Sequence, residues 1–259
     1  MREYDHLDVS VDSDVFRITF NRPERLNAVN RNVHEELSTV FEDAQESEAR
    51  VVVVTGAGDA FCAGGDIKAM NEDEQYSYHE PQSIIKGMVN CEKPIIGRVN
   101  GDAVGLGATL ALFCDIVIAS TDARFGDTHV KVGLSAGDGG GIIWPLLIGP
   151  NKAKEFLMTG KLISAEEAEE LGLINHAVEP DELDAKVTEL VDELATGSQV
   201  AIQYTKMSIN SMLEDAVNSA LLKSLALERN TMHHPDHAHA VEAFKNGEQP
   251  NFPTGRDPN

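Results

Sequence analysis

Cysteines, basic residues and long apolar runs are all scarce in this chain of 259 residues. The three cysteines, Cys62, Cys91 and Cys114, are odd in number and match no metal-ligand spacing, which excludes a small disulfide-stapled fold. No apolar run approaches the roughly 18 residues that a membrane span needs. Residues 1–6 lack the apolar core of a signal peptide. The sequence therefore predicts a soluble protein of the reducing cytoplasm, with no membrane partner.

Positive charge is also scarce, because 21 Lys and Arg residues stand against 43 Asp and Glu residues and leave a formal net charge of −22. This charge opposes binding to phosphate backbones, so we expect no nucleic-acid partner. The acidic residues are dispersed, as in residues 166–170 and 181–184, which is typical of solvated helix faces. High salt screens the self-repulsion of such a surface, so the composition predicts a halophilic protein.

The first part of the chain predicts an α/β fold. Residues 7–21 alternate apolar and polar side chains around a short polar turn and predict a hairpin. Apolar side chains then recur at helical spacing from Val33 to Ala44, and the apolar run from Val51 to Val54 predicts a buried strand over residues 50–55. The resulting strand-helix-strand order predicts a layered fold, in which ligands tend to lie at the carboxyl ends of the strands.

Two glycine-rich segments follow predicted strands. In the first, residues 61–68, Ala63, Gly64 and Gly65 leave the backbone N–H groups accessible just before an expected helix start at Ile67. The second, residues 100–107, follows an apolar strand and also leads into a helix. Either segment alone equally fits a ligand-free turn. Together they predict backbone donors that converge on one developing oxyanion.

The remaining pattern divides the chain into a core, residues 1–195, and a C-terminal helical oligomerisation region, residues 196–259. Residues 71–80 are polar and irregular, and we expect them to form a surface segment or lid. Helical spacing dominates after residue 150. The other expected elements are a helix at 83–91, strands at 94–99, 115–119 and 174–178, and an apolar helix at 142–148.

Two short motifs point elsewhere but fit poorly. Residues 133–137 match the G-x-S-x-G nucleophile elbow of hydrolases, yet residues 128–132 offer only a short strand before it. The elbow would also leave both glycine-rich segments unexplained. Residues 56–58 resemble the start of a dinucleotide-binding fingerprint, but Phe61 stands where its third glycine should be. We favour neither interpretation.

Histidines gather near the C-terminus but do not form a convincing metal site. Pro235 interrupts the face that the first and third of them would share, and no carboxylate or cysteine frame accompanies them. A solvent-facing helix start is the favoured interpretation, so we expect no metal. His34 and His176 are expected to be surface or packing residues. The cluster consists of His233, His234, His237 and His239.

Five segments taken together resemble the enoyl-CoA hydratase/isomerase (crotonase) superfamily. They are residues 61–68, 94–107, 114–116, 125–126 and 160–168, and the resemblance extends from residue 21 to residue 245. It implies a crotonase-like spiral of repeated ββα units and a C-terminal helical trimerisation region that builds homotrimers or homohexamers. It also implies an acyl-CoA thioester substrate, with coenzyme A as part of the substrate and no tightly bound cofactor.

The resemblance also implies roles for particular residues. The matching oxyanion-hole positions are Gly65 and Leu106, whose backbone N–H groups would polarise the thioester carbonyl. The positions that match the CoA pocket are Leu26, Ala63, Asp66, Ile67 and Lys68, with Phe244 and Lys245 closing over the nucleotide end.

The acid/base positions depart from the family pattern. Hydratases carry two glutamates, and Thr109 and His129 stand at the matching positions here. Threonine does not titrate near neutral pH, so the usual two-carboxylate hydration is in doubt. Asp138, at an expected helix start, is a candidate acid/base and equally fits a helix cap. His129 suits proton transfer near neutral pH, and packing or pantetheine contact fits it equally.

We therefore expect an enzyme that stabilises an enolate-like thioester intermediate, with His129 and Asp138 moving the proton. Enoyl-CoA hydratase or isomerase is the nearest activity, and Asp127 and Ser135 are candidate supporting residues. Thioester hydrolysis or decarboxylation, in which the oxyanion hole does most of the catalysis, is the alternative among enzymes. A non-catalytic acyl-CoA-binding protein is the alternative outside enzymes.

The acidic composition predicts a dependence of stability on salt. We expect the melting temperature to fall when the protein is desalted, because the dispersed carboxylates then repel one another without screening. Scanning calorimetry across a salt series measures this change. Equal melting temperatures in dilute buffer and in molar salt would contradict the halophilic interpretation.

Overall fold

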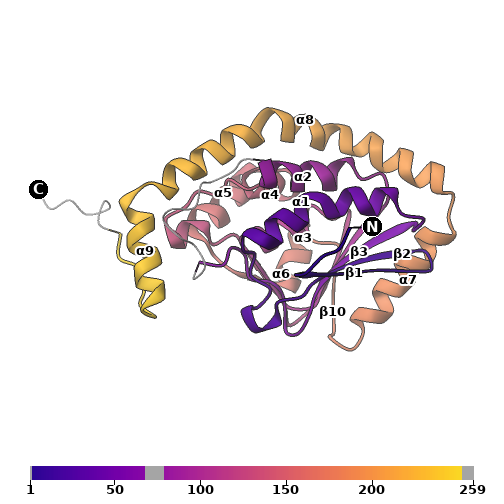
Figure 1. The fold of residues 1–259 in the computed structure, drawn as a ribbon, viewed down its shortest axis with the longest axis horizontal. Coiled ribbons are helices and arrows are strands. Elements are labelled where there is room, and N and C mark those ends of the chain that lie inside the picture. The colour runs from indigo at the N-terminus through magenta and orange to yellow at the C-terminus, as the bar shows by residue number, and fades with distance from the viewer. Residues whose placement is uncertain (1, 68–78, 253–259) are drawn as a thin grey trace, which may run out of the picture.

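The computed structural model describes residues 2–67 and 79–252, and these form an α/β fold with two sheets (Figure 1). One sheet has six strands in the order β1-β2-β3-β5-β7-β10, and the other has four in the order β4-β6-β8-β9. Among the described residues, no helix is both long enough and apolar enough to span a bilayer.

The six-stranded sheet begins with an antiparallel hairpin and continues in parallel strands. Its strands are β1 (Leu7–Asp12), β2 (Val15–Phe20), β3 (Val51–Gly56), β5 (Ile95–Val99), β7 (Ile116–Ser120) and β10 (His176–Val178). The hairpin predicted for residues 7–21 is confirmed, with Leu7 opposite Phe20. In the parallel part, Val52 pairs with Ile95.

The second sheet is made of very short strands, three of which each follow a strand of the first. They are β4 (Ala60–Cys62), β6 (Asp102–Val104), β8 (Arg124–Gly126) and β9 (Ile163–Ser164). The first three precede α2 (His79–Asn90), α3 (Leu106–Leu112) and α4 (Gly140–Ile148) respectively. This order confirms the expected ββα units. Strands β4 and β6 lie inside segments expected to be loops, because three residues are too few to display a strand's alternation.

Alternate residues of β3 contribute to two cores, because successive side chains of a strand point to opposite faces. Val52 and Val54 belong to the main core, with α1 (Arg31–Glu46) and α2. Val51 and Val53 pack with Leu183 of α7 (Leu183–Thr196). The sheet thus lies between α1 and α2 on one side and α7 on the other (Figure 1).

The helices predicted after residue 150 are confirmed. They are α5 (Pro150–Thr159), α6 (Ala165–Glu170), α8 (Gln199–Met232) and α9 (Pro235–Lys245). Figure 1 shows α8 running across the top of the molecule and α9 turning away from its end. Val217, Leu221 and Leu225 of α8 are buried in the main core. The division between core and oligomerisation region at residue 195 stays a prediction.

A buried lysine attaches α8 to the large sheet, at the amino-terminal ends of β5 and β7. The ammonium group of Lys206 lies 2.7 Å from Asp115 Oδ2 and donates to the carbonyl of Lys93 at 2.8 Å. The same Asp115 oxygen accepts the backbone N–H of Ile95 at 2.7 Å. A charge buried with these partners fixes the position of the helix, because removing either partner would leave the other uncompensated.

Two expectations about local structure are wrong. His79 and Glu80 begin α2 and are not part of an irregular segment, whereas residues 68–78, with Lys68 and most of the expected lid, lie outside the described residues. The G-x-S-x-G motif at 133–137 follows the 3-10 helix η2 (His129–Val132), not a strand. A nucleophile elbow requires a strand at that place, so the serine of this motif has no elbow geometry.

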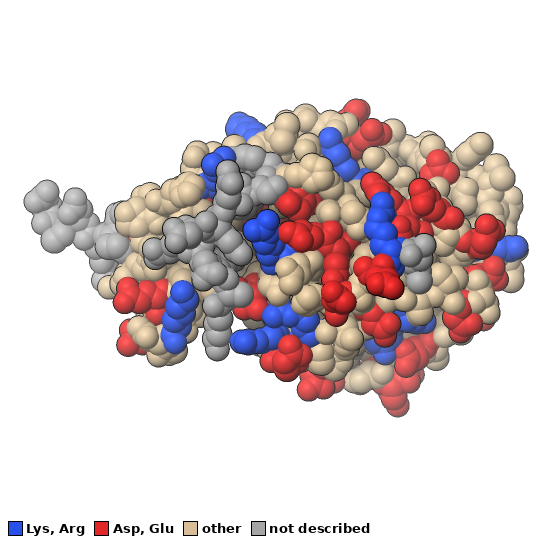
Figure 2. Space-filling model, in the orientation of Figure 1, with Lys and Arg blue, Asp and Glu red and all other residues tan. Residues whose placement is uncertain are grey.

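Acidic side chains are spread over the face of the molecule shown in Figure 2, with Lys and Arg side chains between them. They do not gather into a single acidic patch on this face. This distribution agrees with the interpretation that the acidic segments are solvated helix faces.

Candidate active site

The two glycine-rich segments contact each other next to His129. Gly64 has a φ of +86°, and a Cβ there would lie 2.7 Å from the carbonyl oxygen of Val104. A Cβ on Gly105 would lie 3.7 Å from Gly64 Cα and 3.7 Å from Cε1 of His129. Only glycine combines this conformation with so close a backbone approach. The two loops can therefore approach each other closely because these glycines have no side chains.

Gly65 and Leu106 present their backbone N–H groups at this contact. Leu106 is the first residue of α3, so its N–H has no carbonyl acceptor within the helix. Gly65 forms a β-bridge with Val29 that uses the Gly64 carbonyl and the Asp66 N–H. Within residues 2–67 and 79–252, no acceptor is found for the Gly65 N–H. Two backbone donors are therefore available at adjacent loops.

Both donors line a cavity of about 800 Å³ between the core and the C-terminal helices. Its wall is formed by loops that follow the strands and by the first turns of α1 and α2. The segment from η2 to residue 138, the C-terminal end of α8 and helix α9 complete it. The apolar lining includes Val29, Pro81, Leu134, Met232 and Val241, and the ionisable lining includes His34, Glu80, His129, Asp138 and Glu228.

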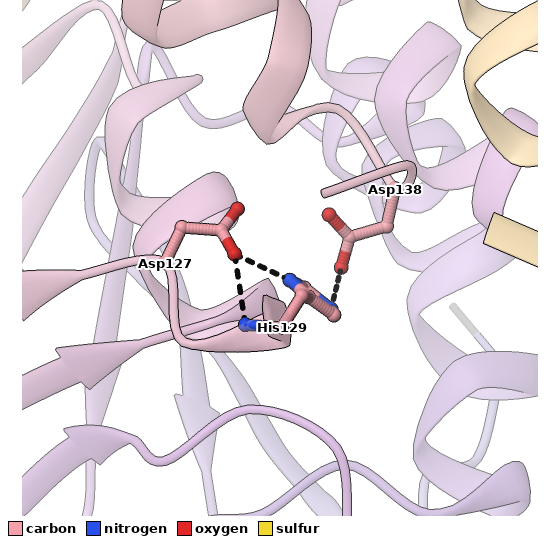
Figure 3. A group of neighbouring side chains, drawn as sticks. All are labelled: Asp127, His129 and Asp138. Atoms are coloured by element: carbon pink, nitrogen blue, oxygen red, sulfur yellow. Dashed lines mark hydrogen bonds and ion pairs between the residues drawn. The ribbon is translucent and has the colours of Figure 1, made fainter. Parts of the chain in front are cut away.

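Asp127, His129 and Asp138 form a hydrogen-bonded group at the cavity (Figure 3). His129 Nδ1 lies 2.6 Å from Asp127 Oδ1, and the same oxygen accepts the His129 backbone N–H at 3.2 Å. On the other side of the ring, Nε2 lies 3.4 Å from Asp138 Oδ2. Both ring nitrogens therefore face carboxylates, and the ring orientation is fixed from two sides.

The charges of this group follow from their mutual proximity. Burial alone lowers the pKa of His129, but the carboxylates of Asp127 and Asp138 outweigh burial and raise that pKa well above 6.5. Burial likewise favours the neutral form of Asp138, whereas the ring of His129 and the Thr109 hydroxyl lower the Asp138 pKa. Near neutral pH the pair is therefore an imidazolium and a carboxylate.

Thr109 supports Asp138 from inside the core. Its hydroxyl donates to Asp138 Oδ1 at 3.2 Å, and its side chain is completely buried. Thr109 thus contacts the acid/base candidate without itself lining the cavity. Ser135, which was named with Asp127 as a candidate supporting residue, contacts the C-terminal region instead, because its backbone N–H donates to Thr231 Oγ1 at 3.1 Å.

Glu228 is a site residue that sequence reasoning missed. It lies on α8, is buried, and its Oε1 is 3.9 Å from His129 Nε2. A Cβ on Gly137 would lie 2.4 Å from Glu228 Cβ, so glycine is required where the loop passes α8. The glycine-rich sequence before α4 was the available signal for such an approach, but it did not identify the partner helix.

Two histidines have surroundings that the sequence did not predict. His34 was expected at the surface or in packing, and it lines the cavity. His237 was assigned to a solvent-facing helix start, but it is buried and its Nδ1 lies 2.7 Å from the carbonyl oxygen of Val132. His233 and His234 are exposed and line the cavity near the start of α9.

The carboxylate–histidine group also has the residue types of a metal site. Asp127, His129 and Asp138 form the one group in the described ranges whose potential ligand atoms all lie within 4.8 Å of one another. Two ligands of one zinc ion stand roughly 3.3 Å apart, since each metal–ligand distance is about 2.0 Å. The 2.6 Å contact between His129 and Asp127 is instead a direct hydrogen bond. The absence of a resident metal stays a prediction.

The expected CoA-binding residues are only partly gathered at the cavity. Its lining includes Ala63, Asp66, Ile67 and Lys245. Asp66 also forms an ion pair of 3.0 Å with Arg22. Leu26 and Phe244 are exposed and lie outside the cavity lining, and Lys68 lies outside the described residues. The roles of all these residues in CoA binding stay predictions.

Comparison with known proteins places this site in context. A family described as enoyl-CoA hydratase/isomerase matches residues 10–255. A short-chain-enoyl-CoA hydratase of Clostridium acetobutylicum is 36% identical over 210 residues, which cover 79% of this chain and 80% of the relative. A 1,2-epoxyphenylacetyl-CoA isomerase of Escherichia coli is 32% identical over 257 residues, which cover 95% of this chain and 97% of the relative.

Solved structures are similar to this chain in fold as well as in sequence. An enoyl-CoA hydratase/isomerase from Mycobacterium paratuberculosis has a TM-score of 0.87 at 37% identity, covering 92% of this chain and 97% of that chain. This likeness confirms the expected crotonase-like α/β fold. Because the family match spans nearly the whole chain and the fold agrees, this protein is an enzyme of the enoyl-CoA hydratase/isomerase family.

Proposed function

We propose that this enzyme binds an acyl-CoA thioester and stabilises its enolate-like oxygen with the N–H groups of Gly65 and Leu106. One observation carries the proposal: the two donors and the His129–Asp138 pair line the same cavity. Donors aimed at developing charge in such a site supply much of the catalysis in acyl chemistry. Coenzyme A enters as part of the substrate, and no tightly bound cofactor is required.

The chemistry of the cavity supports a CoA ligand. The names of the two relatives described above identify them as enzymes that act on CoA thioesters. Arg31, His233, His234 and Lys245 line the cavity, and such side chains pair with phosphate groups. We assign the nucleotide end of CoA to this basic rim, which leaves the carboxylate-rich part of the cavity for the acyl group.

Asp138 is the group that we assign to proton transfer. As a carboxylate it accepts a proton from the carbon next to the thioester carbonyl, while the oxyanion donors stabilise the electron pair that moves onto oxygen. His129 keeps Asp138 ionised and, through Nε2–H, holds it in place. Glu228 Oε1 lies 3.9 Å from the same Nε2, so a second carboxyl group stands close to this end of the ring. This arrangement suits removal of a proton at one carbon and its return at another.

An assembly through the C-terminal helices forms part of the proposal. Large apolar side chains remain exposed along α8, and we propose that they pack against other copies in a homotrimer or homohexamer. They include Val200, Tyr204, Met207, Ile209 and Met212.

Removal of the Asp138 carboxylate tests the proton-transfer role. We expect Asp138→Asn to lower kcat/KM by roughly 10²- to 10⁴-fold, because the amide cannot accept the proton. Acyl-CoA binding, measured by calorimetry, should persist. The exposed Asp181→Asn is the matched control and should behave as the parent.

Product analysis by mass distinguishes isomerisation and hydration from hydrolysis and decarboxylation. No turnover on enoyl-, β-ketoacyl- and malonyl-type thioesters would contradict the enzyme proposal.

Substitution of Asp127 tests its role as a positioning residue through the pH profile. The raised pKa of His129 keeps the imidazolium present until the pH rises through that pKa, so activity that needs the cation is lost on the alkaline side. Asp127→Asn removes one negative charge and lowers this pKa. We therefore expect the alkaline limb of kcat/KM to move to lower pH. A profile that scales down without moving would contradict this assignment.

A proline at position 106 tests the oxyanion donor separately. Leu106 is the first residue of α3, where a helix tolerates proline, so Leu106→Pro removes the N–H with little damage to the helix. We expect kcat to fall by about 10²- to 10³-fold relative to Leu106→Ala, which keeps the N–H. Equal rates in these two variants, with equal melting temperatures, would contradict the role of this donor.

A further inference from the structure

His34 is a partly buried hydrogen-bonding group that the proposed proton transfer does not use. It lies in the first turns of α1 and lines the cavity. Its Nδ1 is buried, and no hydrogen-bond partner for this atom is found in the part of the chain that the structure describes. Burial lowers the pKa of His34, so the ring is neutral near neutral pH.

The neighbours of His34 place it at the acyl end of the cavity. The carboxyl groups of Asp138 and Glu80, which also line the cavity, are close enough to act electrostatically on its ring. Asp138 is the acid/base group of the proposed function, so a ligand atom beside His34 is close to the reacting carbons. The basic side chains that suit CoA phosphates come from other parts of the lining, such as Lys245 of α9.

A plain alkyl chain fits this part of the cavity poorly. It would exclude water from the His34 ring without offering a partner to Nδ1, and an unsatisfied buried nitrogen is unfavourable. A ligand carboxylate fits poorly as well, because a neutral imidazole provides no counter-charge for a buried anion. A neutral oxygen avoids both penalties, since a hydroxyl or a carbonyl can pair with a neutral imidazole.

We propose that His34 is a specificity-determining residue that hydrogen-bonds a neutral hydroxyl or keto oxygen on the acyl group, so that the preferred substrates are oxygenated acyl-CoA thioesters. This inference rests on the proposed function, because it places the acyl group beside Asp138. It differs from that proposal in concerning recognition of the acyl chain and not the movement of the proton.

Binding of saturated thioesters tests the inference without turnover. Calorimetry would compare hexanoyl-CoA with its 4-, 5- and 6-hydroxy derivatives, 5-oxohexanoyl-CoA and adipoyl-CoA, which ends in a carboxylate. We expect at least one hydroxy or oxo thioester to bind about tenfold more tightly than hexanoyl-CoA, as expected for one hydrogen bond to a buried group. Adipoyl-CoA should bind more weakly than that thioester.

Variants of His34 connect this preference to the side chain. His34→Phe keeps a ring of similar size and should reduce the preference to less than about threefold. His34→Asn returns a polar atom near the place of Nδ1 and should restore part of it. His176→Phe is the matched control, because His176 lies on β10 outside the cavity lining. Melting temperatures check that each variant is folded.

The possible failures are distinguishable. Equal binding of hexanoyl-CoA and all oxygenated thioesters by the parent protein would overturn the role of His34 and leave the proposed function standing. The same holds if adipoyl-CoA binds most tightly, or if folded His34→Phe keeps the full preference. No binding of any acyl-CoA would overturn the proposed function, and the inference with it.

Discussion

The imidazolium of His129 is the charge on which the rest of the site depends. Two buried carboxylates lie 2.6 and 3.4 Å from its ring nitrogens. Without a cation between them, the two carboxylates would repel each other in a medium that stabilises charge poorly. Because both nitrogens of His129 are engaged, the ring is not a free base. This is why the proposed function assigns proton transfer to Asp138, which lines the cavity, and not to the ring.

Thr109 fits this distribution of charge. A glutamate at position 109, where the resemblance places one in hydratases, would add another buried carboxylate beside Asp138 with no further cation. Such a neighbour would raise the pKa of one of the two carboxyl groups. The threonine instead donates a hydrogen bond to Asp138 and helps to keep it ionised. Under the proposed function, the acid/base group therefore comes from the segment that carries Asp138, and Thr109 supports it through this hydrogen bond.

Sequence reasoning succeeded where the signal was local or belonged to an ordered set of motifs. The hairpin at 7–21 and the helix from Val33 to Ala44 have clear periodicity, and both are present. Strands β4 and β6 were missed because three residues carry no visible period. Glu228 was missed for a different reason. It is one of many acidic residues on a long helix, and only the three-dimensional approach of Gly137 to α8 distinguishes it.

This approach makes the C-terminal helices part of the active-site scaffold. The segment that carries Asp138 is held by Thr231 of α8, which accepts the Ser135 N–H, and by His237 of α9, which bonds to the Val132 carbonyl. A shift of either helix would move Asp138 relative to His129, and their separation of 3.4 Å decides the charge of both groups. Under the proposed function, a contact that changes the packing of α8 or α9 would therefore affect proton transfer as well as stability.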